Sequence, residues 1–444
     1  GAVLMPSYII RNMRKMFSHC LKLSYKDTAQ QNSYVTIPRA ANSFDNTEIA
    51  ANVDEDIIDS LTGGRLVGSV TSFENFAECP LRYYLRYGVD LKEREEFTFS
   101  PVNFGVVLHA VIREVCDEIK KNGESYYLIS EEKRREMVKR SVAAITDIYQ
   151  NSILKDSSRN SFMIKRMEDL ADRTVWAMGE QLKCGDFVPF VFEHKFNMEV
   201  GDGDRKQLMS GTIDRVDICE NGTDVYVRII DYKTGKKDFN IVKTYYGIDI
   251  QLMVYMEAAM KLVAKMRPGK NVIPAGVFYY NISDPIVSAT TESAEEIEDK
   301  IKGELRLKGM VNSDKDIAEK MDNTEGTSLN IPVSRKADGG FDSRRSKVMN
   351  TEQFNMLGRF VDVRAIDTAD RIAGGDIRRS PYKDGQFSSC DRCPYGAVCG
   401  FSVDLPGCNY RKLKKFDDEV LWNNIKEGVD ENGKKMDTGA EERD

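Results

Sequence analysis

The sequence predicts a mixed α/β domain, and three observations indicate this fold class. Two runs rich in β-branched residues, 211–218 and 225–233, flank an Asn-Gly pair at 221–222, which is the strongest short signal for a β-hairpin. The segment Pro101–Lys121 repeats its apolar residues at the spacing of one helix face. A second apolar segment, 246–266, predicts another helix after the hairpin.

The predicted hairpin carries charged residues at matched positions. Asp214 and Asp231 are nearly equidistant from the turn, so they are expected opposite or diagonal to each other on one face. Lys233 lies two residues after Asp231 and projects from the same face. Two carboxylates and an ammonium group suit a divalent metal and a phosphodiester. The alternative is a surface hairpin with a cross-strand Asp–Lys pair.

Composition excludes several classes of protein. The chain has 444 residues, 41% of them hydrophobic and 30% charged, as in an ordinary soluble protein. No apolar run approaches the roughly 18 residues of a membrane span, so no membrane partner is expected. A formal charge of −7 argues against a uniformly basic coat for nucleic acid. Nine cysteines without a secretion signal indicate a reduced, cytoplasmic compartment and metal or cluster binding.

The character of the chain changes along its length. Residues 1–65 are expected to be a linker or the remnant of a preceding helicase-like region, which suggests the C-terminal part of a longer polypeptide. Residues 66–415 are predicted to form the folded domain, with further strands at 187–196 and 275–280. Residues 416–444 are expected to be a charged, disordered tail, with at most one short helix after Phe416.

Two other residues are candidates for the acidic site. His109 lies beside the apolar stripe of the first helix, where a histidine is usually a satisfied core or boundary residue. Glu193 lies on the strand before the hairpin and could join the site or be an edge charge. The residues alone leave both alternatives open.

A cysteine cluster near the C-terminus predicts a metal or cluster site. Cys390, Cys393 and Cys399 have the spacing C-x₂-C-x₅-C, in a loop with a proline and a glycine. A fourth ligand is needed. Cys408 would complete a local site typical of zinc, whereas Cys79 would complete a [4Fe–4S] site that joins distant parts of the chain.

An ordered set of motifs resembles RecB-type PD-(D/E)XK nucleases. These are F-x-x-C-P-L-R-Y-Y-L-R-Y-G-V at 76–89, F-G-x-x-L-H at 104–109, G-T-I-D-R-V-D at 211–217, I-I-D-Y-K-T-G at 229–235, Y-Y-G-I-D-I-Q-L-M-V-Y at 245–255 and the cysteine cluster. Over 69–415 the chain is most similar to the nuclease domain of the B subunits of AddAB-type ATP-dependent helicase/nucleases. The resemblance implies a restriction-endonuclease-like core, a mixed sheet flanked by helices, with helical insertions and an iron–sulfur staple.

The resemblance also implies roles for individual residues. Mg²⁺ or Mn²⁺ would be held by His109, Asp214, Asp231 and the Tyr232 carbonyl, and Lys233 would be the catalytic lysine. Gln251 and Tyr255 match the family's Q-x₃-Y motif. Cys79, Cys390, Cys393 and Cys399 match the four ligands of one [4Fe–4S] cluster, which leaves Cys408 outside.

The function that the resemblance implies is metal-dependent cleavage of single-stranded DNA passing through a channel. It would serve DNA end resection in double-strand break repair, in a heterodimer with an ATP-driven helicase/nuclease partner in the bacterial cytoplasm. One alternative is a stand-alone RecB-like nuclease of the CRISPR-associated kind. Another is a catalytically silent DNA-binding module stapled by the cluster. The combination of His109, Asp214, Asp231 and Lys233 argues against the silent module.

Overall fold

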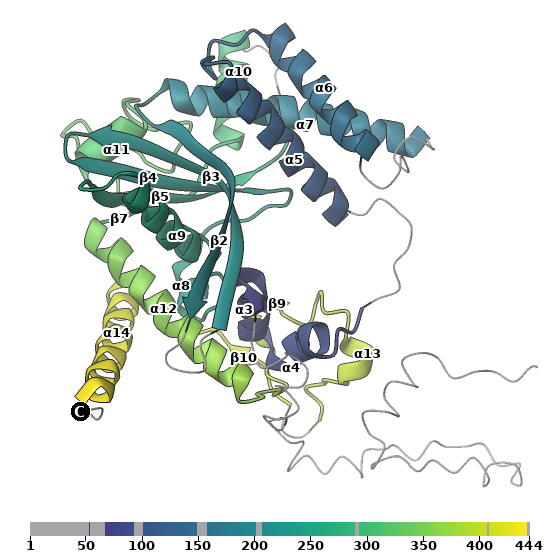
Figure 1. The fold of residues 1–444 in the computed structure, drawn as a ribbon, viewed down its shortest axis with the longest axis vertical. Helices are drawn as coiled ribbons and strands as arrows, with labels where there is room; N and C mark the ends of the chain where they lie inside the picture. Colours follow the sequence, from purple (N-terminus) through teal and green to yellow (C-terminus); the bar gives the residue numbers. More distant parts are fainter. Residues whose placement is uncertain are drawn as a thin grey trace, which may run out of the picture. The chain divides into compact units, whose positions relative to one another are not determined.

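The computed structural model describes residues 53, 67–92, 101–148, 158–200, 207–288, 293–405 and 408–441. Apart from Val53, the linker or remnant predicted at 1–65 lies outside these residues. In the described part, runs of helices and strands follow one another from β1 to α14 (Figure 1). No helix among those described combines the length and apolar character needed to cross a membrane.

A seven-stranded mixed sheet forms the centre of the fold. Its order is β1-β3-β4-β5-β6-β7, and β2 also pairs with β3. The predicted hairpin is confirmed as the antiparallel pair β3–β4, and the parallel pairing of β4 with β5 makes the sheet mixed. The strands are β1 Val67–Ser69, β2 Val188–Val200, β3 Gln207–Asn221, β4 Asp224–Lys233, β5 Asn271–Asn281, β6 Lys308–Asn312 and β7 Val348–Met349.

Helices cover both faces of this sheet (Figure 1). Helices α5 (Pro101–Lys121), α6 (Glu131–Ile148) and α7 (Ser158–Lys183) pack together on one face. Helices α9 (Gln251–Met266) and α12 (Thr351–Ala373) pack on the other. Nearly every residue of β4 is buried. Since successive side chains of a strand point to opposite faces, both faces of β4 are covered. The predicted mixed α/β class is therefore confirmed.

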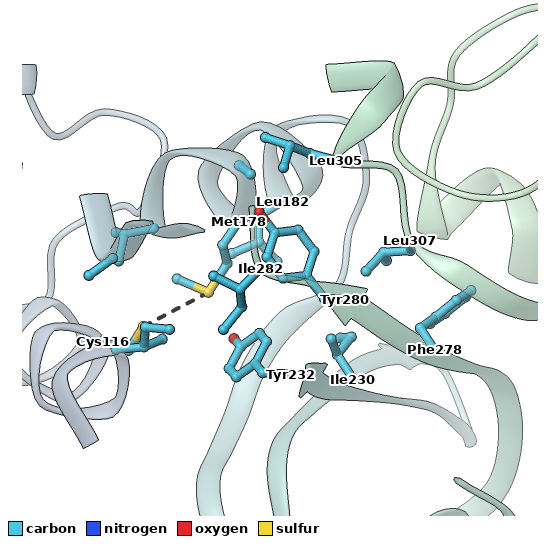
Figure 2. Close-up of a cluster of buried hydrophobic side chains, with 14 of the residues drawn as sticks. Cys116, Met178, Leu182, Ile230, Tyr232, Phe278, Tyr280, Ile282, Leu305 and Leu307 are labelled. Carbon is cyan, nitrogen blue, oxygen red and sulfur yellow. Dashed lines mark hydrogen bonds between the residues drawn. The ribbon is translucent and has the colours of Figure 1, made fainter. Parts of the chain in front are cut away.

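The core on the α5–α7 side reaches the end of β4. Figure 2 shows Tyr232 of β4 and Tyr280 of β5 close to Met178 of α7 and Cys116 of α5. The rings of Tyr232 and Tyr280 meet edge to face, with centroids 5.9 Å apart. This packing makes the stretch from Asp231 to Lys233 part of a rigid strand.

Two boundaries differ from the sequence-based expectation. The helix expected from 246 begins at Gln251, after the short α8 (Ile241–Tyr245) and a turn. The tail from 416, expected to be disordered apart from at most one short helix, contains α14 (Asp418–Glu441), which is longer than expected and whose Leu421 and Ile425 are buried in the core on the α9 side. Apolar burial against α12 explains why this segment is ordered where those side chains pack.

The remaining elements lie at the edges of this layered core and in the cysteine region. They are α3 Val70–Glu78, α4 Pro80–Tyr83, the π-helix η2 Tyr84–Gly88, α10 Ala294–Glu304, α11 Lys315–Met321, β8 Tyr382–Asp384, β9 Phe387–Ser388, α13 Gly396–Cys399 and β10 Arg411–Lys412.

Candidate active site

The two hairpin carboxylates face each other. The β3–β4 ladder ends at the pair of Arg215 with Ile230, and Asp214 and Asp231 are the next residues beyond it on the two strands. Both side chains are buried, with 7% of Asp214 and 2% of Asp231 exposed. The Tyr232 amide donates a hydrogen bond of 2.6 Å to Asp214 Oδ2 and fixes that carboxylate. The expectation that they share one face therefore agrees with the register.

Lys233 and Gln251 extend this acidic pair. Lys233 Nζ forms an ion pair with Asp231 Oδ2 and donates to Gln251 Oε1 at 3.0 Å. Gln251 Nε2 in turn donates to Asp231 Oδ1 at 3.1 Å and to the Tyr255 hydroxyl at 2.9 Å. The Gln251 amide therefore bridges the carboxylate and the ammonium group, and Tyr255 fixes the orientation of that amide.

His109 reaches the site from α5 on the other side. Its Nδ1 lies 3.3 Å from Asp214 Oδ1 and 3.7 Å from Glu193 Oε1. One ligand atom from each of these three residues lies within 4.8 Å of the others, a grouping that could hold a metal ion. Asp231 lies outside this grouping. The structure thus places His109 at the acidic site, and it adds Glu193, which the sequence left undecided.

The backbone of Glu193 departs from ordinary strand geometry. Its φ of 48° lies in the left-handed region, which non-glycine residues rarely adopt. Its neighbours Phe192 and His194 pair with Arg215 and Ile213, so Glu193 lies across the ladder from Asp214. A weak acidic candidate on a predicted strand was the only sequence signal for this residue.

Burial and charge shift the acid–base properties of the site. Burial, followed by the charge of Asp214, raises the pKa of Asp231 to about 7. Burial alone would lower the pKa of His109, but hydrogen bonds and charge from Asp214 and Glu193 outweigh it and raise that pKa to about 10. Shifts of this kind are common at functional sites.

Asp217, the remaining acidic residue of β3, has a structural environment. It is fully buried and binds Arg215 and Arg228 in a buried ion-pair triad. Burial alone would raise the pKa of Asp217, but the two guanidinium groups outweigh it and lower that pKa. Asp217 is therefore a neighbour of the site and no part of the metal grouping.

Four cysteines from distant segments line one pocket. Cys79 lies between α3 and α4, and Cys390, Cys393 and Cys399 come from the loop around α13. Among the described cysteines, Cys408 is buried but does not line this pocket. A hydrogen bond of 3.3 Å from the Leu81 amide to the Arg378 carbonyl holds the two segments together.

The comparisons with known proteins assign this architecture to one class of enzyme. Residues 68–400 match the model of the PD-(D/E)XK nuclease superfamily, and the chain belongs to that superfamily. The resemblance found in the sequence is thereby confirmed.

Three curated relatives carry the same name, which is that of the B subunit of an ATP-dependent helicase/deoxyribonuclease. The protein of that name from Lachnoclostridium phytofermentans is 34% identical over 399 residues, which cover 87% of this chain and 34% of the relative. The one from Thermoanaerobacter sp. is 33% identical over 380 residues, covering 83% and 33%. The one from Clostridium botulinum strain Hall is 31% identical over 441 residues, covering 96% and 38%. The chain spans about a third of the length of these relatives.

Proposed function

We propose that this chain is the nuclease part of the B subunit of a helicase–nuclease, where it hydrolyses phosphodiester bonds in single-stranded DNA. Its membership in the PD-(D/E)XK nuclease superfamily and the name that its relatives carry support this proposal. The strand would pass the site in a channel, during end resection in double-strand break repair. The partner would be the ATP-driven A subunit of a heterodimer in the bacterial cytoplasm.

The observation that carries the proposal is the convergence of four side chains at the end of the hairpin. They are those of His109, Asp214, Asp231 and Lys233. His109, Asp214 and Asp231 offer the nitrogen and hard oxygen ligands that suit Mg²⁺ or Mn²⁺. The Tyr232 carbonyl would be a further ligand. Bound there, the metal would polarise the phosphate and lower the pKa of the attacking water. Glu193 is close enough to His109 and Asp214 to complete an acidic ligand set.

The side chains of the chain itself would orient the reacting groups. The Lys233 ammonium beside Asp231 would stabilise the negative charge that develops on the phosphate. Gln251 holds Lys233 and Asp231 at a fixed separation through both ends of its amide. Tyr255 would act through Gln251, because its hydroxyl accepts from the amide nitrogen.

The cysteine pocket supports the further proposal that Cys79, Cys390, Cys393 and Cys399 would hold a structural [4Fe–4S] cluster. Four thiols around one pocket provide the donor set that such a cluster requires. Burial raises the pKa of the Cys79, Cys390 and Cys399 thiols, which disfavours their thiolate form when no metal is bound. A bound cluster would hold them as thiolates and join the α3 segment to the C-terminal loop.

The test is cleavage of single-stranded DNA by the full chain with Mg²⁺, in the presence and absence of EDTA. Cleavage should require the metal and be lost in Asp214→Ala and Lys233→Ala, since removal of a ligand or of the ammonium group costs orders of magnitude in rate. Asp238→Ala is the matched control, because Asp238 is an exposed carboxylate that forms an ion pair with Lys347. Circular dichroism checks that each variant is folded.

Two outcomes would contradict the proposal. If a folded Asp214→Ala or Lys233→Ala variant were as active as the parent, the assignment of these residues to the active site would be contradicted. DNA binding without any metal-dependent cleavage by the parent chain would instead favour the silent module.

A further inference from the structure

Helix α9, which carries Gln251, begins without a capping side chain of its own. Its N-cap is Ile250, an apolar residue that makes no side-chain hydrogen bond to the helix. The first N–H groups of a helix have no partner within the helix and need an external acceptor. The acceptor here comes from a different element, far away in the sequence.

Glu74 of α3 supplies that acceptor. Its Oε1 accepts hydrogen bonds from the Ile250 amide at 2.9 Å and the Gln251 amide at 3.0 Å. A carboxylate at this end of a helix is also favoured by the helix dipole. Glu74 thus fixes the backbone of the residue whose side chain bridges Asp231 and Lys233.

The surroundings of Glu74 favour its role as a hydrogen-bond acceptor over a role as a permanently charged group. Burial raises the pKa of Glu74 to about 7, and the charges of Lys237, Asp249 and Lys233 act on it as well. Lys237 is already paired with Asp249 at 3.0 Å. Near neutral pH the carboxyl is therefore often protonated, and one oxygen still accepts from the two amides.

We infer that Glu74 is a positioning residue for the reaction: it holds the first turn of α9 so that the Gln251 amide stays between Asp231 and Lys233. This inference rests on the proposed nuclease function. It names a residue that the motif around Gln251 does not contain, because Glu74 lies 177 positions away from Gln251 in the sequence.

Two substitutions of Glu74 distinguish the effect of side-chain length from the effect of side-chain charge. Glu74→Gln keeps an oxygen at the same distance without charge, whereas Glu74→Asp keeps the charge on a side chain shorter by one methylene. We expect Glu74→Gln to retain kcat within about three-fold. We expect Glu74→Asp and Glu74→Ala to lose about ten- to a hundred-fold in kcat with little change in KM, since small misplacements of reacting groups are costly. An Asp variant as active as the Gln variant, or more active, would overturn the inference.

A double-mutant cycle with Gln251→Ala tests whether Glu74 acts through Gln251. Mn²⁺ binding measured without DNA gives a readout independent of turnover. Each single variant, Glu74→Ala and Gln251→Ala, should weaken Mn²⁺ affinity by about ten-fold, and the double variant should be no weaker. If the loss of Mn²⁺ affinity in the double variant equals the product of the two single losses, the two residues act independently. That result would contradict the inference.

Glu78→Ala is the matched control, because Glu78 lies one turn further along α3 and pairs with Arg82. It should keep parental kcat and Mn²⁺ affinity. The parent chain and the Asp214→Ala variant distinguish failure of the proposed function from failure of the role of Glu74. If the parent shows no metal-dependent cleavage, the proposed function fails, and if Asp214→Ala cleaves DNA like the parent, the active-site assignment fails. If Asp214→Ala is inactive while folded Glu74→Ala equals the parent, only the role of Glu74 fails.

Discussion

At the scale of single residues, burial changes the protonation of Asp231. Its pKa is raised to about 7 by burial and by Asp214, from an ordinary value of 3.8. The folded chain therefore keeps a proton that the unfolded chain loses. The contribution of Asp231 to stability is most favourable at pH values below 3.8 and is lost as the pH rises through about 7.

Metal affinity should follow the opposite trend, because a carboxylate ligand must be deprotonated to bind. We expect Mn²⁺ affinity to fall as the pH is lowered through about 7, and protonation of Asp231 should contribute up to about ten-fold per unit to this fall. His109 must also lose a proton, so the affinity should keep rising above neutrality. Calorimetric titration across this pH range measures the trend, and an affinity independent of pH would contradict the assignment of these ligands.

At the scale of elements, the packing of β3 against α9 controls the position of Gln251. Gly211 of β3 allows this close approach. A Cβ atom there would lie 2.9 Å from a Tyr255 ring carbon and 2.7 Å from the Phe196 ring. Tyr255 must then shift, and it is the residue that orients the Gln251 amide.

Gly211→Ala is therefore expected to destabilise the fold by about 1–3 kcal/mol and to lower cleavage as well. Urea unfolding and the nuclease assay measure the two effects. Gly358→Ala on α12 is the control, because no atom lies within 4 Å of the added Cβ. Equal activity of the two variants would show that Tyr255 tolerates the displacement.

The individual helices and strands also show how much of the fold could be predicted from the sequence. The β3–β4 hairpin follows from its β-branched runs and the Asn221-Gly222 turn, since these signals are local. The predicted start of α9 was wrong by several residues, because Gly247 has a φ of 76° and Asp249 accepts a hydrogen bond from Tyr279. Strand β6 was missed because it has few apolar residues and becomes a strand only by pairing with β5.

Part of the candidate site could likewise be predicted from local sequence signals, and part could not. The opposition of Asp214 and Asp231 follows from a turn between them, so the local sequence contains it. His109 and Glu193 join them only through tertiary packing, which residue patterns do not encode. Glu74 had no sequence signal at all, because its role depends on helix α3 meeting the start of α9.

At the scale of the whole molecule, the cysteine pocket joins two parts of the described chain that lie far apart in sequence. We expect Cys79→Ala to lose bound iron and to unfold at a lower temperature, because a ligand set that closes a long loop stabilises the folded state. Cys408→Ala should keep its iron, since Cys408 does not line the pocket. Iron analysis and visible absorbance measure both, and a Cys79→Ala variant with full absorbance would point to Cys408 as the fourth ligand.

The left-handed conformation of Glu193 implies a trade-off between stability and activity. A non-glycine residue in that region costs on the order of 1 kcal/mol or more, and its carboxylate lies near that of Asp214. We expect Glu193→Gly to melt above Glu193→Ala without metal, while both bind Mn²⁺ more weakly than the parent. The reverse order of melting would show that the backbone there is unstrained. If the expected order holds, the simplest way to a more heat-resistant protein at this position also removes a carboxylate of the proposed metal site.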